Sequence, residues 1–309
     1  MDRAVNHSKN HLIFFGLFIS ILFVTINPSA GRDYASYYDI IERIYDGRLS
    51  FVKEYMFFLY TKLGWSMGFS PGFVIWQLRI IFFYLFLRFG LQNSESPFLF
   101  ICFFFFVPNI FLGSLNALQT WLSISIGVYT LHGNSLRRNI ILLTIATGFH
   151  VFAIFYAPII FLKRISKASL KRIIIISIPI TLIASEIIIL ILTKIGLIKY
   201  LYSASFSYKA IVITFCLTTI QLIAYFFSKK KKYLIFIIPH ILMFTCLYQF
   251  KIDNEIALRS VNFLLPMGWI ALDTIVKKFK PKWLVTALII TSMLFNLIMT
   301  IDPVGDNLW

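Results

Sequence analysis

A few ionisable and amide side chains interrupt apolar stretches of this sequence, and chemistry is expected there first. A charged or polar side chain costs about 2.5 to 3.5 kcal/mol at the centre of a membrane helix, so each one is a functional candidate. His150 lies in such a stretch beside Gly148, where a helix is expected to break. Histidine can exchange a proton near neutral pH or, when charged, contact a phosphate. The alternative is a hydrogen bond to a neighbouring helix, and the break favours a functional role.

Three arginines are candidates for binding a phosphate or pyrophosphate, because a guanidinium group donates paired hydrogen bonds to such anions. Arg259 follows a short acidic segment, Arg32 opens the longest hydrophilic stretch, and Arg79 lies inside an apolar run. Arg259 could instead be an interfacial side chain paired with Glu255, and Arg79 a structural partner of Glu186. The sequence leaves these alternatives open.

Carboxylates and amides close to these arginines suit a site that binds a sugar next to a phosphate. Asp33 and Glu54 can act as a base or orient a hydroxyl group. Asn116 and Gln119 can hydrogen-bond sugar hydroxyls, although asparagine is also a common helix cap. The other charged residues of the hydrophilic stretch are expected to lie on a solvated surface: Asp39, Glu42, Arg43, Asp46 and Arg48.

Several other chemistries lack the motifs that they need. The sequence has no Gly-rich phosphate loop, no His-Glu-x-x-His and no Asp-x-Asp. Cys102, Cys216 and Cys246 lie in apolar runs without metal-ligand spacing. We therefore expect no metal and no other cofactor. His240, which follows Pro239 in an apolar run, is expected to have a packing role.

The composition identifies the kind of protein that must position these residues. Of 309 residues, 59% are hydrophobic and 14% are charged, and the mean hydropathy is +0.82. Soluble domains have roughly 25% charged residues, so this class is excluded. The net charge of +16 comes from short basic blocks between apolar runs, where Lys and Arg set membrane topology. The sequence therefore predicts an all-α, polytopic membrane protein and argues against nucleic acid as a partner.

The apolar runs predict about nine membrane spans, since a span needs roughly 20 residues. They cover residues 12–27, 72–89, 97–113, 117–131, 173–193, 210–228, 233–250, 261–276 and 283–301. Two further segments, 54–68 and 139–161, are expected to be broken or re-entrant helices, which are tolerated where protein or water surrounds them. Counting both segments as spans gives eleven spans. The N- and C-termini then stay on the same sides of the membrane as in the nine-span arrangement.

The N-terminal run is expected to remain as an uncleaved anchor with a cytoplasmic N-terminus, although Asn27 to Gly31 would also suit a cleaved signal peptide. Residues 28–53 then form a periplasmic loop, and residues 302–309 a short periplasmic tail. Helical spacing within the loop predicts an amphipathic helix on the outer membrane interface: Tyr34, Tyr37, Tyr38, Ile41, Ile44 and Tyr45. The whole chain, 1–309, is expected to form a single transmembrane domain.

The order of five short segments carries a resemblance to a known family. The segments are Arg32 to Tyr38, Glu54 to Gly64, Asn116 to Gln119, Gly148 to His150 and Asn254 to Arg259. In this order they resemble the EpsG family of bacterial exopolysaccharide and O-antigen polymerases, within the wider Wzy-type group. One position departs from the family pattern, because this chain has Leu118 where the family commonly has arginine.

The resemblance implies a metal-independent glycosyltransferase that polymerises lipid-linked oligosaccharide repeat units. It would transfer a glycan from undecaprenyl pyrophosphate to the acceptor sugar of another lipid-linked repeat, at the periplasmic face of the bacterial inner membrane. Its partners would be that lipid-linked oligosaccharide and the membrane lipid. A chain-length regulator protein is a further possible partner.

The resemblance also suggests a role for each candidate residue. Arginines would bind the pyrophosphate and stabilise the charge that develops on it: Arg259, Arg32 and Arg79. Amides would hold the sugar: Asn116, Gln119 and Asn254. The catalytic group would be His150, as base or phosphate contact, with carboxylates that orient the acceptor or serve as the base: Glu54 and Asp33.

Rival functions differ in what they require of the sequence. An O-antigen ligase, or another undecaprenyl-linked glycosyltransferase, would more often have a larger soluble periplasmic loop. A non-enzymatic flippase for the lipid-linked repeat would be expected to have two pseudo-symmetric halves, and the sequence has no such repeat. An acyltransferase is a weaker alternative, because its paired motifs are missing.

Overall fold

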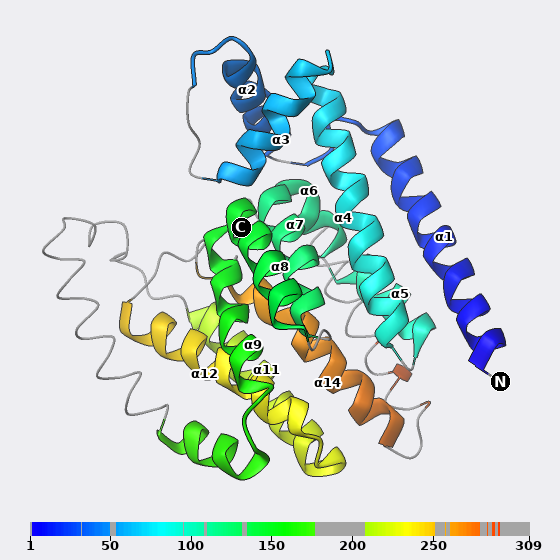
Figure 1. The fold of residues 1–309 in the computed structure, drawn as a ribbon. Coiled ribbons are helices and arrows are strands. Elements are labelled where there is room, and N and C mark those ends of the chain that lie inside the picture. Colours follow the sequence, from blue (N-terminus) through cyan, green and yellow to red (C-terminus); the bar gives the residue numbers. More distant parts are fainter. Residues whose placement is uncertain are drawn as a thin grey trace, which may run out of the picture. The chain divides into compact units, whose positions relative to one another are not determined.

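The structure is a computed structural model, and its described part is helical (Figure 1). It describes residues 2–31, 33–49, 54–94, 96–107, 110–131, 135–176, 208–250, 257 and 260–278, with single positions 283, 286, 287 and 290. No strand occurs within these ranges, so the expected all-α class is confirmed. Glu186, the tail 302–309 and most of the predicted spans 173–193 and 283–301 lie outside the described residues. The chain divides into two compact units, each described by itself.

The first unit contains residues 1–129, 144–151 and 279–309. Its helices are α1 (Asp2–Ile26), α2 (Tyr34–Tyr45), α3 (Tyr55–Ser66), α4 (Pro71–Asn93), α5 (Pro97–Phe106), α6 (Phe111–Asn116), α7 (Leu118–Gly127) and the last part of α8 (Leu136–Phe149). Helices α1, α2, α5 and α7 all pack against α4. Ser70 caps α4 by accepting a hydrogen bond from the backbone N–H of Phe73, and Pro71 occupies the first helical turn. The longest helix outside the N-terminus is therefore the centre of this unit.

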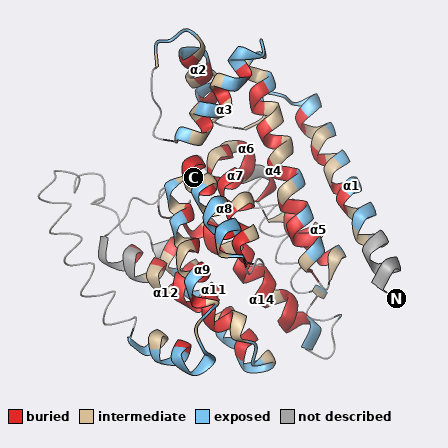
Figure 2. Ribbon diagram, viewed as in Figure 1, coloured by how far each residue is buried: buried red, intermediate tan, exposed pale blue. Residues whose placement is uncertain are grey.

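Aromatic rings fill the space around α4, which is buried along much of its length (Figure 2). Phe82 and Phe86 pack edge-on against Trp121 of α7, with ring centroids 5.9 Å apart in each pair. Phe86 also stacks on Phe100 of α5 at 6.0 Å. At Gly90 an added Cβ would lie 1.8 Å from Cζ of Phe100, so only glycine lets α5 approach α4 this closely.

The predicted amphipathic helix is confirmed as α2. Tyr37, Ile41 and Ile44 are buried on one side, and the remaining side is open. Arg43 forms an ion pair with Asp39 at 2.9 Å, and both side chains are more than half exposed, so the pair contributes little stability. The predicted surface residues are all exposed: Asp39, Glu42, Arg43, Asp46 and Arg48. The position of α2 on the outer membrane interface stays a prediction.

The second unit contains residues 130–143 and 152–278. Its main helices are α9 (Ala157–Leu162), α11 (Tyr208–Ser228), α12 (Lys231–Phe250) and α14 (Leu265–Lys278), together with a helix over 167–176. Helix α11 packs against both α12 and α14. The Tyr156 hydroxyl donates to the carbonyl of Phe263 at 2.7 Å, which ties the segment before α9 to the turn before α14. His240 is fully buried in α12, with Nδ1 2.6 Å from the carbonyl of Phe236, as a packing role requires.

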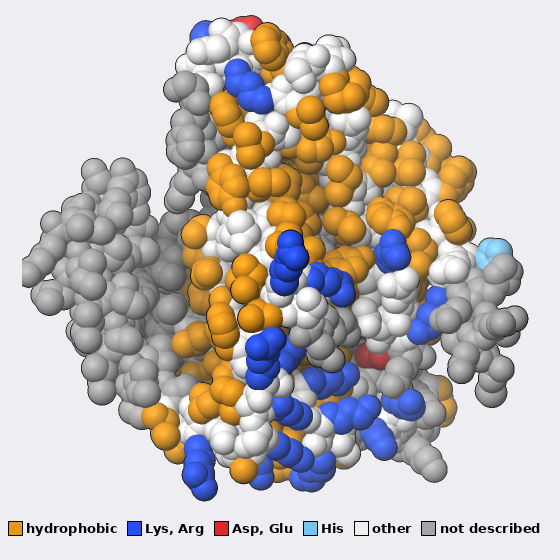
Figure 3. Space-filling view, in the orientation of Figure 1, with side chains coloured by type: hydrophobic (Ala, Val, Ile, Leu, Met, Phe, Trp, Pro, Cys, Tyr) orange, Lys and Arg blue, Asp and Glu red, His pale blue; other side chains and the backbone are white. Residues whose placement is uncertain are grey.

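Helix lengths bear on how the chain meets a membrane. Three described helices are long and apolar enough to span one: Lys9–Ile26, Pro71–Asn93 and Lys209–Ser228. Exposed hydrophobic side chains cover much of the face seen in Figure 3, as expected for lipid contact. The predicted span 97–113 is wrong as one continuous helix, because α5 ends at Phe106 and α6 begins at Phe111. The number of nine spans stays a prediction.

The two ambiguous segments are short or broken helices, as expected. Segment 54–68 forms α3, whose 12 residues give about 18 Å, well short of the roughly 30 Å of a hydrocarbon core. Segment 139–161 is broken at His150. Helix α8 ends at Phe149, and a 3₁₀ helix, η2 (Val151–Tyr156), follows directly. The predicted break is therefore confirmed at the residue where it was placed.

The close contact at Gly90 predicts the effect of a methyl group. Gly90→Ala should lower the free energy of unfolding by about 1 to 3 kcal/mol, because the Phe100 ring must move out of a packed core. Thermal unfolding of the purified protein in detergent measures this loss. Replacing the Phe100 ring by the smaller leucine side chain, in Gly90→Ala/Phe100→Leu, should recover part of the lost free energy of unfolding. A wild-type unfolding midpoint for Gly90→Ala would contradict the contact.

Candidate functional site

The helix break at His150 is held by a side chain from α7. The carbonyl of Ala146 accepts a helical hydrogen bond from the backbone N–H of His150 at 3.0 Å. The Ser123 hydroxyl donates to the carbonyl of Ala146 at 2.7 Å and lies 3.4 Å from that of His150. His150 itself is half-buried at the end of α8. Ser123 therefore fixes the backbone from which the His150 side chain extends.

The beginning of α3 lies against the same break. At Gly148, an added Cβ would lie 2.3 Å from Cγ of Met56 and 2.6 Å from Cζ of Tyr55. The Tyr55 hydroxyl also donates to the carbonyl of Thr144 at 2.8 Å. Glu54, the N-cap residue of α3, immediately precedes Tyr55 and is half-buried. The segments that carry Glu54 and His150 are therefore neighbours.

Arg79 joins the loop after α1 to the end of α6. Its guanidinium donates from Nη1 to the carbonyl of Pro28 at 2.9 Å and from Nη2 to that of Ala30. The same Nη2 lies 3.5 Å from the carbonyl of Leu115, and the Tyr34 ring covers the guanidinium at 5.5 Å. The side chain is 1% exposed. Arg79 thus contacts main-chain oxygens. Glu186, the structural partner considered for Arg79 from the sequence, lies outside the described residues.

Gly31 brings this loop into direct contact with α6. It has a φ of +105°, which glycine adopts readily, and an added Cβ would lie 2.4 Å from the carbonyl oxygen of Leu115. Asp33 follows Gly31 by two residues, and Asn116 follows Leu115 directly. The segments that carry Asp33 and Asn116 therefore touch, and both side chains are half-buried.

Helix α7 connects these two groups of residues. It begins just after Asn116, and Ser123 at the helix break lies one turn beyond Gln119 on the same side. Gln119 is half-buried, whereas most of α7 is buried. Leu118, at the position where the EpsG pattern has arginine, is 1% exposed and belongs to the core. The structure therefore brings together segments that carry Asp33, Glu54, Asn116, Gln119 and His150.

Three candidates named from the sequence fall outside the described residues: Arg32, Asn254 and Arg259. Of these, Arg32 follows directly in sequence after the segment that Arg79 contacts. Nothing in the described part of the chain places the other two. Their roles stay predictions.

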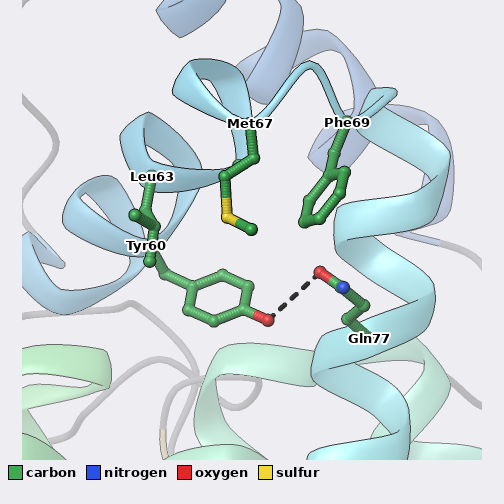
Figure 4. A pocket seen from close by; sticks show the side chains of 6 residues that line it. Tyr60, Leu63, Met67, Phe69 and Gln77 are labelled. Carbon is green, nitrogen blue, oxygen red and sulfur yellow. Dashed lines mark hydrogen bonds between the residues drawn. The ribbon is translucent and has the colours of Figure 1, made fainter.

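A pocket of about 240 Å³ lies between α3 and α4 (Figure 4). It is lined by Tyr60, Leu63, Gly64, Met67, Phe69 and Gln77. The Tyr60 hydroxyl donates to Oε1 of Gln77 at 3.2 Å, and this pair is its polar edge. Such a mostly apolar pocket can take a small group that offers one hydrogen-bonding edge. The sequence did not predict this pocket. Its one signal in the sequence is the amide of Gln77 inside an apolar run.

The family comparison agrees with the segment order seen in the sequence. A model of the EpsG family matches residues 10–308, which is nearly the whole chain. The chain belongs to the EpsG family. EpsG proteins form a Wzy-like polysaccharide polymerase family. No curated protein and no solved structure matches this EpsG protein. With its long apolar helices, it is a membrane protein of polysaccharide biosynthesis.

The contacts of Arg79 predict how its replacement acts. Arg79→Met should lower the free energy of unfolding by about 1 to 3 kcal/mol, because the carbonyls of Pro28 and Ala30 lose the donors of a buried guanidinium. Thermal unfolding in detergent, followed by tryptophan fluorescence, measures this. Arg88→Met is the matched control, since Arg88 is an exposed arginine on the same helix that donates to the Tyr84 hydroxyl. Equal unfolding midpoints for the two variants would contradict a structural role for Arg79.

Proposed function

We propose that this EpsG protein polymerises lipid-linked oligosaccharide repeat units. It transfers a growing glycan from undecaprenyl pyrophosphate to the acceptor sugar of a second lipid-linked repeat, at the periplasmic face of the inner membrane. Family membership supports the polymerase class. The observation that carries the site is the convergence of the segments bearing Asp33, Glu54, Asn116, Gln119 and His150 within the first unit.

The reaction needs a base and a stabiliser for the leaving group. The acceptor hydroxyl oxygen forms a bond to the anomeric carbon of the donor glycan, and the bond from that carbon to the pyrophosphate oxygen breaks. The hydroxyl proton passes to the base, and undecaprenyl pyrophosphate leaves with the electron pair. Cationic donors stabilise the charge on that leaving group, so no metal is needed.

Glu54 and His150 are the groups proposed to handle the proton. Both are half-buried and come from adjacent segments, so one can accept the proton while the other orients the acceptor or contacts a phosphate. Asp33, on the loop against α6, is the alternative carboxylate. Asn116 and Gln119 lie along the start of α7 and are proposed to hold the sugar, together with Asn254.

Arginines are proposed to bind the pyrophosphate. Arg259 and Arg32 are assigned to direct contact. Arg79 acts through the segment 28–31, because its own Nη atoms already donate to Pro28 and Ala30. A buried guanidinium also keeps its positive charge close to the site, which favours an anion there.

Loss of the polymerase should leave a single repeat unit on the glycan carrier. A deletion strain is expected to make surface glycan with one repeat, and His150→Ala and Glu54→Gln should lower polymer yield by about 10² or more. Gel electrophoresis of extracted glycan measures chain length, and immunoblotting of membranes measures protein level. Glu42→Gln is the matched control for Glu54→Gln, because Glu42 is an exposed carboxylate on α2. A deletion strain that lacks even the single-repeat form would contradict polymerase and favour a ligase or flippase.

A further inference from the structure

Two basic segments of the second unit are held side by side. The Lys231 ammonium donates to the carbonyl of Lys163 at 2.7 Å, across 68 residues of sequence. The Lys167 ammonium donates to the carbonyl of Lys229 at 2.8 Å, across 62 residues. Arg138 is close enough to affect the charge of Lys163. We name these residues the basic cluster: Arg138, Lys163, Lys167, Lys229 and Lys231.

Little negative charge accompanies the basic cluster. The described residues of the second unit contain a single carboxylate, that of Asp273, which is 3% exposed. Burial and the charge of Arg138 lower the pKa of the Lys163 ammonium to about 8. The like charges of Arg138 and Lys163 repel one another, and a bound anion would relieve that repulsion.

The backbone at Lys229 points to a role for its charge. It is the one non-glycine residue with positive φ, +53°, in the part of the chain that the structure describes. It follows the last residue of α11, a position where glycine is the usual choice. Its ammonium lies 5.0 Å from the Phe226 ring and 5.7 Å from the Tyr225 ring, and Lys167 covers the same Tyr225 at 5.5 Å. Both ammonium groups are therefore held against the aromatic end of α11.

An exposed apolar surface continues from the basic cluster along α11. Lys209–Ser228 is apolar and long enough to span a membrane, and it ends at the cluster. Phe226 is 64% exposed, and Phe161 at the end of α9 is 60% exposed. Figure 3 shows Lys and Arg side chains gathered at the lower end of the visible face, with hydrophobic side chains next to them. Cations at one end of an exposed apolar helix match an amphiphile with an anionic headgroup.

We propose that the basic cluster binds the phosphodiester headgroup of an anionic phospholipid, whose acyl chains lie along the exposed side of α11. The lipid comes from the leaflet in which α11 ends at Ser228. This site uses none of the residues assigned to glycan transfer, so it stands or fails independently of the proposed function.

Binding of defined lipids to the purified full-length protein tests this. In a neutral detergent, phosphatidylglycerol should raise the thermal unfolding midpoint and give retained adducts in native mass spectrometry, whereas phosphatidylcholine should do neither. Lys167→Gln/Lys229→Gln should lower the affinity for phosphatidylglycerol at least about tenfold. Lys277→Gln/Lys278→Gln removes the same charge from the end of α14 and should keep the wild-type affinity.

A glycine substitution separates lipid binding from folding. Glycine suits the positive φ, so Lys229→Gly should raise the thermal unfolding midpoint of the lipid-free protein. Because the variant also lacks the Lys229 charge, phosphatidylglycerol should raise that midpoint less than it does in the wild type. A Lys229→Gly variant that keeps the full phosphatidylglycerol effect would overturn the proposal. An equal loss of phosphatidylglycerol affinity in Lys167→Gln/Lys229→Gln and in Lys277→Gln/Lys278→Gln would also overturn the proposal. So would inorganic phosphate, if it raised the unfolding midpoint as much as the same concentration of phosphatidylglycerol does.

Discussion

Helix ends in apolar surroundings leave backbone carbonyls without donors, and the first unit depends on how these carbonyls are satisfied. Arg79 supplies donors to the loop after α1 and to the end of α6. Ser123 does the same at the break of α8, and Tyr55 bonds the turn just before it. At the break of α8 these bonds are additional ones, because the Ala146 carbonyl also accepts from the backbone N–H of His150, and each contributes about 0.5 to 1.5 kcal/mol.

The same donors explain why polar candidates can lie half-buried in so apolar a protein. Each donor is close to a candidate along the chain or on the same helix face. Tyr55 follows Glu54, Ser123 lies one turn from Gln119, and the loop held by Arg79 continues into Asp33. The donors therefore fix the backbone from which the candidate side chains extend.

Patterns local in sequence predicted much of the fold. Helical spacing identified α2, and a glycine two residues before a histidine inside an apolar run located the break of α8. The division of 97–113 into α5 and α6 was missed, because the aromatic run continues past Phe106 without a polar signal. The partners of Arg79 could not be predicted, since backbone carbonyls have no sequence signature. The order of short segments identified the family, whereas the contacts between those segments required coordinates.

The break at His150 also affects the lipid around the protein. The apolar segment Val151–Leu162 is half 3₁₀ and half α-helix, which gives a length of about 21 Å against roughly 30 Å for a hydrocarbon core. Val151 and Phe161, near its two ends, are both more than half exposed. Where an apolar segment is shorter than the hydrocarbon core, the bilayer thins locally or flanking side chains reach to the interface. For the proposed lipid-linked substrate, local thinning beside this segment would shorten the distance that its headgroup travels into the protein.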